Sequence, residues 1–252
     1  MKIVIIGTGH VATILGRKIL AAGHELLQVF GRNSLYAEAL AETLSTTYTT
    51  DKNHLDLSAD LYLMAISDNA IAEVAGSLQL GKKLVVHTAG SVSKDVLKAC
   101  SKNYGVLYPL QSLRREMTVL PDIPFLVDGN TDDDRTLIAD FAATLSNQVQ
   151  FAGDEQRLKL HVAAVIVSNF SNHLYTLAQE FCLQEKVDFN MLLPLITGIA
   201  DRLYQFSPHE VQTGPAIRRD EGTIQKHLEV LQQHASLKEL YQVFTKSIQS
   251  VH

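Results

Sequence analysis

Cysteine is scarce in this chain, and its scarcity excludes two classes of protein. Only Cys100 and Cys182 occur, far apart, and neither has a second Cys or a His at metal-ligand spacing. This pattern argues against a disulfide framework and against a zinc site. We therefore expect no metal, and a reducing compartment such as the cytoplasm.

Clusters of positive charge are also missing. The chain has 22 Lys and Arg against 27 Asp and Glu, a formal net charge of -5, and basic residues occur at most in pairs such as Lys82-Lys83 and Arg114-Arg115. Because a nucleic-acid surface needs clustered cations, we expect no nucleic-acid partner.

Long apolar runs are absent as well. The N-terminal run Ile3–Ile6 stops at Gly7, whereas a secretory signal needs about 7 to 15 apolar residues. The longest stretch without a charged side chain, Leu160–Gln179, carries His, Ser and Asn, which are costly in lipid. The sequence predicts neither a signal peptide nor a membrane span.

What the chain does contain, up to Gly153, is an alternation of short apolar runs with helical patterns. Runs that are apolar nearly throughout are typical of parallel strands covered on both faces, so the pattern predicts a doubly wound parallel α/β sheet, a Rossmann-type domain of residues 1–153. The expected strands are 3–6, 26–30, 61–66, 84–86, 105–108, 125–127 and 149–151, and the expected helices are 11–22, 35–44, 70–80 and 132–145.

From residue 154 the periodicity is helical almost to the end, which predicts an all-α second domain of residues 154–252. Its first helix should run from Asp154 to about Glu185. Because the residues after this helix are too few to cover it, we expect part of its apolar surface to meet a second copy in a homodimer.

A glycine motif lies between the first strand and the first helix. It reads Gly7-Thr8-Gly9-His10-Val11-Ala12 and matches the dinucleotide-binding pattern G-x-G-x-x-[G/A]. Gly7 allows a tight turn, Gly9 lets a pyrophosphate approach the backbone, and Ala12 lets helix and strand pack closely. The alternative is a tight turn without a ligand, but the position of the motif favours nucleotide binding at the helix N-terminus.

The end of the second strand indicates which dinucleotide binds. An NAD site usually places Asp or Glu about 20 residues after the glycines, whereas this chain has Arg32, Asn33 and Ser34 there. A planar cation with neighbouring donors suits a ribose phosphate, so the sequence predicts NADP. Alternatively, Arg32 is a solvated surface residue and Asn33-Ser34 only caps the next helix.

Two further segments follow strands and should border the nicotinamide, because ligands of open α/β sheets bind at the carboxyl ends of the strands. One contains Ser67 and Asp68, and the other runs His87-Thr88-Ala89-Gly90. The alternatives are that Asp68 caps a helix and that His87 is a hydrogen-bonded buried histidine.

On the long helix, Arg157, His161, Ser168 and Asn172 fall within an arc of roughly 60° at 100° per residue. This polar stripe either pairs across an interface or lines a cleft facing the nicotinamide, and we favour the cleft. His161 is then the first candidate acid, with His87 as the next, and Arg157 is a candidate anchor for an anionic substrate. Ser168 and Asn172 are candidate substrate contacts.

The segment from Thr213 to His227 is rich in polar groups. Arg218 and Thr223 could reach the same cleft, or the segment could have a local role as a Gly-Pro turn followed by a helix capped by Asp220. Both interpretations stay open.

Several segments together resemble the Rossmann-fold reductases similar to 6-phosphogluconate dehydrogenase and pyrroline-5-carboxylate reductase, and within that group a bacterial family of NADP oxidoreductases. The resemblance rests on 7–12, 66–71, 86–91, 108–111, 157–169 and 214–224. It implies a helical, dimer-forming second domain that closes over the nicotinamide. Related hydroxyacid dehydrogenases use a lysine on the corresponding helix, but Lys159 points nearly opposite His161, so that role does not carry over.

The sequence thus predicts an NADP-dependent oxidoreductase that transfers a hydride between nicotinamide and a carbonyl or imine carbon of a small substrate. A non-catalytic NADP-binding regulatory or scaffold protein is the alternative, since fold similarity does not establish turnover. A 3-hydroxy acid dehydrogenase is disfavoured by the missing lysine.

Overall fold

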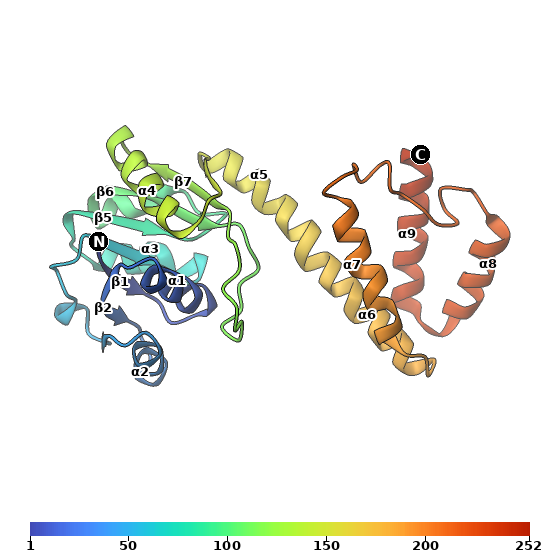
Figure 1. The fold of residues 1–252 in the computed structure, drawn as a ribbon, viewed down its shortest axis with the longest axis horizontal. Coiled ribbons are helices and arrows are strands. Elements are labelled where there is room, and N and C mark those ends of the chain that lie inside the picture. The colour runs from blue at the N-terminus through green and yellow to red at the C-terminus, as the bar shows by residue number, and fades with distance from the viewer. The chain divides into compact units, whose positions relative to one another are not determined.

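The computed structural model describes residues 1–252 and divides into two compact units, Met1–Ser168 (unit 1) and Asn169–His252 (unit 2). Unit 1 is built on an eight-stranded sheet with the order β3-β2-β1-β4-β5-β6-β7-β8, drawn from blue to green in Figure 1. The strands are β1 Lys2–Ile6, β2 Glu25–Phe30, β3 Thr47–Thr49, β4 Leu61–Met64, β5 Gly81–His87, β6 Ser101–Pro109, β7 Phe125–Gly129 and β8 Val149–Phe151.

Neighbouring strands are parallel except for β7, which pairs antiparallel with β6. The predicted doubly wound Rossmann-type sheet is confirmed. Two features were not predicted: the short edge strand β3 and the reversed direction of β7. The connection from β6 to β7 contains no helix, and after it the chain returns antiparallel to β6.

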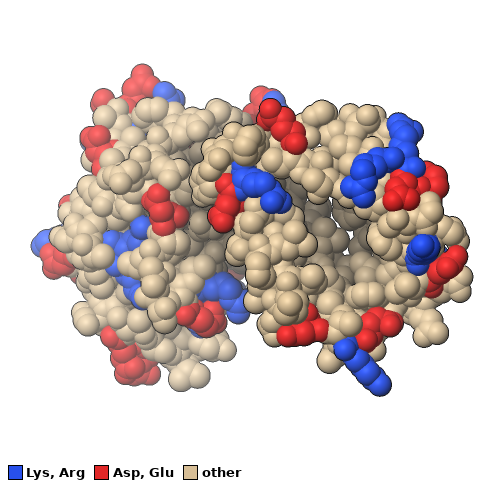
Figure 2. All heavy atoms as spheres, turned by 45° about the vertical axis from the view of Figure 1, so that its right-hand side comes forward, with Lys and Arg blue, Asp and Glu red and all other residues tan.

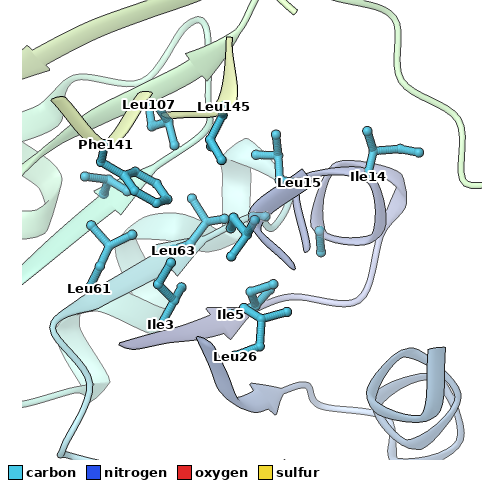
Figure 3. Close-up of a cluster of buried hydrophobic side chains, with 14 of the residues drawn as sticks. Ile3, Ile5, Ile14, Leu15, Leu26, Leu61, Leu63, Leu107, Phe141 and Leu145 are labelled. Carbon is cyan, nitrogen blue, oxygen red and sulfur yellow. The ribbon is translucent and has the colours of Figure 1, made fainter. Parts of the chain in front are cut away.

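Helices cover both faces of this sheet because alternate residues of a strand point to opposite faces. Ile3 and Ile5 pack with Ile14 of α1, whereas Val4 and Ile6 pack in a second cluster with residues of α3. Figure 3 shows the first cluster, in which side chains from β1, β4, β6, α1 and α4 meet. The helices are α1 His10–Ala21, α2 Ser34–Thr43, α3 Asp68–Ser77 and α4 Asp132–Leu145.

A long helical segment follows β8. It consists of α5 Asp154–Ala164, a π-helical stretch Val165–Phe170 and α6 Ser171–Gln184, so its extent agrees closely with the predicted helix from 154 to about 185. The division between the units falls inside this segment, after Ser168, rather than at Gly153. Unit 1 therefore includes α5, which the sequence pattern groups with the helical domain.

Unit 2 is entirely helical, with α6, α7 Leu193–Arg202, α8 Glu221–Val230 and α9 Ala235–Val251. Only four of its apolar residues are buried: Cys182, Ala216, Ile224 and Leu231. Many large apolar side chains of this unit are exposed, among them Leu183, Met191, Leu195, Ile199, Leu203, Tyr204 and Phe206. Unit 2 therefore presents much more apolar surface than it buries.

The surface in the view of Figure 2 carries acidic and basic side chains singly or in small mixed groups, separated by larger uncharged areas. None of the helices combines the length and the apolar character that a membrane crossing requires.

Candidate dinucleotide and proton-transfer site

The turn between β1 and α1 has the geometry that the glycine motif predicted. Gly7 has a φ of 127°, a conformation open to glycine, and its N–H donates to the Phe30 carbonyl at 2.8 Å. A Cβ at Gly7 would lie 2.1 Å from the Ala65 carbonyl oxygen, whereas a Cβ at Gly9 would meet nothing within 4 Å. Gly7 is therefore required by the fold, and Gly9 leaves open space above the N-terminus of α1.

That open space is part of a cavity of about 810 Å³ at the carboxyl ends of β1, β2, β4 and β5. The site lies where the strand order reverses between β1 and β4, the position at which open α/β sheets bind ligands. Of the predicted cofactor residues, ten line the cavity: Gly7, Thr8, Gly9, His10, Val11, Arg32, Asn33, Ser67, Asp68 and Thr88. Ser34, Ala89 and Gly90 are not among its lining residues.

Arg32 projects from the end of β2 with an exposed side chain that forms no hydrogen bond or ion pair in the structure. Asn33 is the N-cap of α2, where its side-chain oxygen accepts from the Tyr36 N–H at 3.2 Å. The helix-capping interpretation thus applies to Asn33. Arg32 remains available to a phosphate group, and no carboxylate occupies the position that would bind the ribose hydroxyls of NAD.

The loops after β4 and β5 are joined by a hydrogen bond from the Ser91 hydroxyl to Asp68 Oδ2 at 2.6 Å. Asp68 is the first residue of α3, and Ser67 is its N-cap without a side-chain cap bond. Asp68 therefore is not the N-cap of this helix, which was the alternative role predicted for it. Instead it connects the two loops that were expected to border the nicotinamide.

His87 is fully buried at the end of β5. Its Nδ1 accepts from the Ala89 N–H at 3.2 Å, so the neutral ring carries its hydrogen on Nε2, which has no protein partner. Burial, and then the charge of Arg157, lower the pKa of His87 to about 4, against weaker opposing effects of the Ser93 backbone, Asp154 and Asp68. The ring is therefore neutral at physiological pH.

The two side chains best suited to proton transfer are Tyr108, on β6, and His161, on α5. The Tyr108 hydroxyl lies 2.8 Å from His161 Nδ1, and the two rings meet edge to face. The His161 ring packs on Gly90, where a Cβ would come within 2.7 Å of its Cγ. Burial is the main cause that raises the pKa of Tyr108, so its hydroxyl keeps its proton at neutral pH.

Sequence reasoning did not single out Tyr108. A signal was available, because Tyr108 stands next to Pro109 at the end of an expected strand, on the edge where ligands bind. What the sequence could not provide was its partner, since His161 lies 53 residues further along the chain.

Arg157 is almost completely buried, with 1% of its surface exposed. Its Nη2 donates to the Val92 carbonyl and to Asp154 Oδ1, the latter at 2.9 Å, while Nε and Nη1 have no partner. Arg157 thus ties the loop after β5 to the first turn of α5.

The predicted polar stripe on the long helix crosses a π-helical stretch. A π-helical turn spans one more residue than an α-helical turn, so the step of 100° per residue does not hold over Val165–Phe170. A role of Ser168 or Asn172 toward a substrate therefore stays a prediction. Ser168 is half-buried, and Asn172 is exposed.

The remaining predicted substrate contacts, Arg218 and Thr223, belong to unit 2. Arg218 is exposed, whereas Thr223 donates from its N–H and its hydroxyl to Asp220, the N-cap of α8. The local capping role predicted for Asp220 is therefore present. A role of Arg218 or Thr223 toward a substrate stays a prediction.

Comparisons with known proteins identify the family of this chain. Residues 2–90 match the family described as NADP oxidoreductase, coenzyme F420-dependent, and residues 123–248 match a domain of unknown function, DUF2520. A protein from Bacteroides fragilis described as an NADP oxidoreductase is 37% identical, covers 99% of this chain and 98% of its own, and superimposes with a TM-score of 0.91. The chain belongs to this family of NADP oxidoreductases. NADP is its cofactor, and the open amide end of α1 with the unpaired Arg32 fits this dinucleotide.

More distant enzymes share the fold of this family. The 1-pyrroline-5-carboxylate reductase of Streptococcus pyogenes is 15% identical, covering 99% of this chain and 98% of its own, with a TM-score of 0.69. A reductive aminase from Aspergillus terreus, solved with NADPH and ethyl-5-oxohexanoate, is 16% identical, covering 98% and 94%, with a TM-score of 0.71. Among curated proteins, no sequence matches the chain.

The first prediction concerns the choice of dinucleotide. Arg32→Ala removes the unpaired cation at the end of β2, and losing one charge-assisted contact costs about 1.5 to 3 kcal/mol. We expect NADPH to bind roughly tenfold or more weakly and NADH to be almost unaffected, as measured by isothermal titration calorimetry.

Gly9→Val is the matched control, because a side chain there enters the cavity without meeting the protein. This variant should fold normally and lose both dinucleotides. Equal affinities of the wild type for NADPH and NADH would contradict the assignment of Arg32.

The second prediction follows from the lowered pKa of His87. Below pH 6.5 the unfolded chain takes up a proton at this ring, whereas the folded protein does not until about pH 4. Stability is therefore present above pH 6.5 and is lost as the pH falls. When the pH is lowered from 7 to 5, protonation of His87 in the unfolded chain should decrease the free energy of unfolding by about 2 kcal/mol.

The measurement is urea unfolding of the wild type and of His87→Asn at both pH values, since asparagine keeps an acceptor but does not titrate. The variant should lose less stability on acidification. An identical pH dependence in the two proteins would contradict a neutral, buried His87.

Proposed function

We propose that the protein is an NADPH-dependent reductase that acts on the carbonyl or imine carbon of a small substrate, with Tyr108 and His161 as the proton-transfer pair. The observation that carries the proposal is their hydrogen bond beside Gly90, at the strand edge where Thr88 lines the cofactor cavity. The activities named for the S. pyogenes and A. terreus enzymes support reduction of a carbonyl or imine carbon.

Bound NADPH supplies the hydride, and the chain supplies the proton that the reduced oxygen or nitrogen needs. His161 Nε2 has no protein partner, while Nδ1 contacts the Tyr108 hydroxyl. As Nε2 gives its proton to the substrate, Nδ1 takes the proton of Tyr108, so the imidazole stays neutral. A proton from solvent then restores the Tyr108 hydroxyl. A hydroxyl and an imidazole in hydrogen-bond contact are suited to such transfer near neutral pH.

Arg157 and His87 lie next to this pair, at the loop after β5. Arg157 holds the loop after β5 against α5, and its buried position leaves it little access to a substrate anion. His87 adds a neutral ring to the same loop. We keep Ser168, Asn172, Arg218 and Thr223 as proposed substrate contacts, for which mutagenesis is the test.

The third prediction separates catalysis from simple binding. His161→Ala should leave NADPH affinity intact and lower turnover by about 10² to 10⁴, the usual contribution of a general acid. Tyr108→Phe should lower turnover in the same direction, by about tenfold or more, because it removes the proton held against Nδ1. Steady-state kinetics on a panel of small ketones and cyclic imines, with calorimetry for NADPH, provides the measurement.

His54→Ala, a change at an exposed histidine, is the control and should behave as the wild type. A His161 variant with a lower melting temperature, whose turnover scales with its folded fraction, would show a structural histidine instead. Wild-type protein that binds NADPH but reduces nothing in the panel would favour the regulatory or scaffold function.

We further propose that the chain forms a homodimer through its helical unit. The support is the imbalance in unit 2, where four apolar residues are buried while side chains such as Met191, at 77% exposure, and Tyr204, at 91%, face solvent. Exposed apolar surface of this extent is typical of an interface. A second copy of the chain would cover it symmetrically.

The fourth prediction is therefore a dimer at micromolar concentration in sedimentation equilibrium. Leu195→Glu on α7 should shift the protein toward monomer because it places a charge in the proposed interface. Glu180→Gln, a change on α6 that adds no charge, is the control and should leave the dimer unchanged. A wild-type monomer of 27.8 kDa would contradict the proposal.

A further inference from the structure

The connection from β6 to β7, residues 110–124, has no regular secondary structure but is held along α1. It is the long green loop in Figure 1. Arg17 Nη1 donates to the Met117 carbonyl at 2.6 Å, and Lys18 Nζ donates to the Pro121 carbonyl at 2.8 Å. Two cations of α1 therefore hold the backbone of this β6–β7 loop.

Apolar side chains also anchor the β6–β7 loop. Leu113 and Ile123 are buried in the main core cluster of unit 1, and Met117 and Leu120 pack against that cluster. Leu113 also lines the cofactor cavity. The loop is thus a packed part of unit 1, and one point of it lies at the cavity wall.

Close to Leu113, the loop meets the N-terminus of α1. His10 Nδ1 accepts from the backbone N–H of Arg115 at 3.0 Å and from its side-chain Nε–H at 3.3 Å. Because Nδ1 acts as an acceptor, the neutral His10 ring carries its hydrogen on Nε2. His10 is the first residue of α1 and lines the cavity, so Arg115 is held beside the anion-binding end of the helix.

The two arginines of the loop differ in their pairing. Arg114 forms an ion pair with Glu116 at 3.3 Å, whereas the two terminal amino groups of Arg115 have no protein partner and the side chain is exposed. A guanidinium held at Nε with both terminal groups unpaired is prepared for bidentate binding of a phosphate.

We propose that Arg115 is a ligand of the dinucleotide pyrophosphate, acting together with the Nε2–H of His10. This inference rests on the cofactor site described above and adds a residue from outside the glycine motif. It also divides recognition between two cations, because Arg32 faces the group that only NADPH carries, whereas Arg115 faces the group that NADPH and NADH share.

Two fragments of the cofactor separate these contacts. ADP carries the pyrophosphate without the 2′-phosphate, and adenosine 2′-monophosphate carries the 2′-phosphate without the pyrophosphate. Calorimetry on the full chain should show that Arg115→Ala weakens ADP, NADPH and NADH by a similar factor, about tenfold, and leaves adenosine 2′-monophosphate unchanged. Arg32→Ala should instead weaken adenosine 2′-monophosphate and NADPH and leave ADP and NADH almost unchanged.

Arg114→Ala is the matched control, because it removes the same charge from the adjacent residue, which already has a carboxylate partner. Arg115→Gln is a second variant that keeps the backbone bond to His10 while removing the cation, and it should behave as Arg115→Ala does. Unchanged ADP affinity in these variants, or the same loss in Arg114→Ala, would overturn the proposal.

A weaker affinity for both fragments together with a lower melting temperature would also overturn it, since that result indicates a loop needed for folding. The outcome is independent of the proposed reaction. A wild type that binds ADP and NADPH but reduces no substrate would defeat the proposed function, while the ADP measurements would still decide the role of Arg115.

Discussion

The close approach of β1 and β4 at Gly7 is the constraint on which the cofactor site depends. With a side chain at this position, its Cβ would lie 2.1 Å from the Ala65 carbonyl, so the two strand ends could not stand as they do. The bond from Ala65 N–H to Ile6 joins the ends of β4 and β1, and the bond from Gly7 N–H to Phe30 joins the ends of β1 and β2. Because α1 begins directly after this turn, its unpaired amides open onto the edge where four strands end.

A second contact brings α5, which carries the proposed proton donor His161, to the same edge. Helix α5 is held on the loop after β5 by the buried Arg157, which bonds to Val92 and Asp154, and by the packing of His161 on Gly90. A buried cation is costly unless it is well paired, and two nitrogens of Arg157 lack partners. Arg157 nevertheless joins the loop after β5 to the first turn of α5, the helix that also carries His161.

Local patterns were enough to predict much of this. Seven of the eight strands, the turn at Gly7–Ala12 and the long helix from Asp154 follow from apolar periodicity, glycine spacing and helix-start residues within a few positions of one another. The absence of a carboxylate after β2 likewise identified Arg32 as the candidate phosphate contact. The antiparallel direction of β7 was missed, because nothing local to residues 110–124 indicates which way the chain returns.

By itself, the sequence determined the class of fold, the glycine turn at the first strand and NADP as the cofactor, because each depends on residues that are neighbours in the chain. Only the tertiary structure decided that Tyr108 meets His161, that Arg157 is buried, and that Arg115 lies against His10 across 105 positions. It also showed the π-helical stretch Val165–Phe170 inside the long helix. These pairings arise from packing between elements far apart in the sequence, and such packing has no signature in the spacing of residues along one segment.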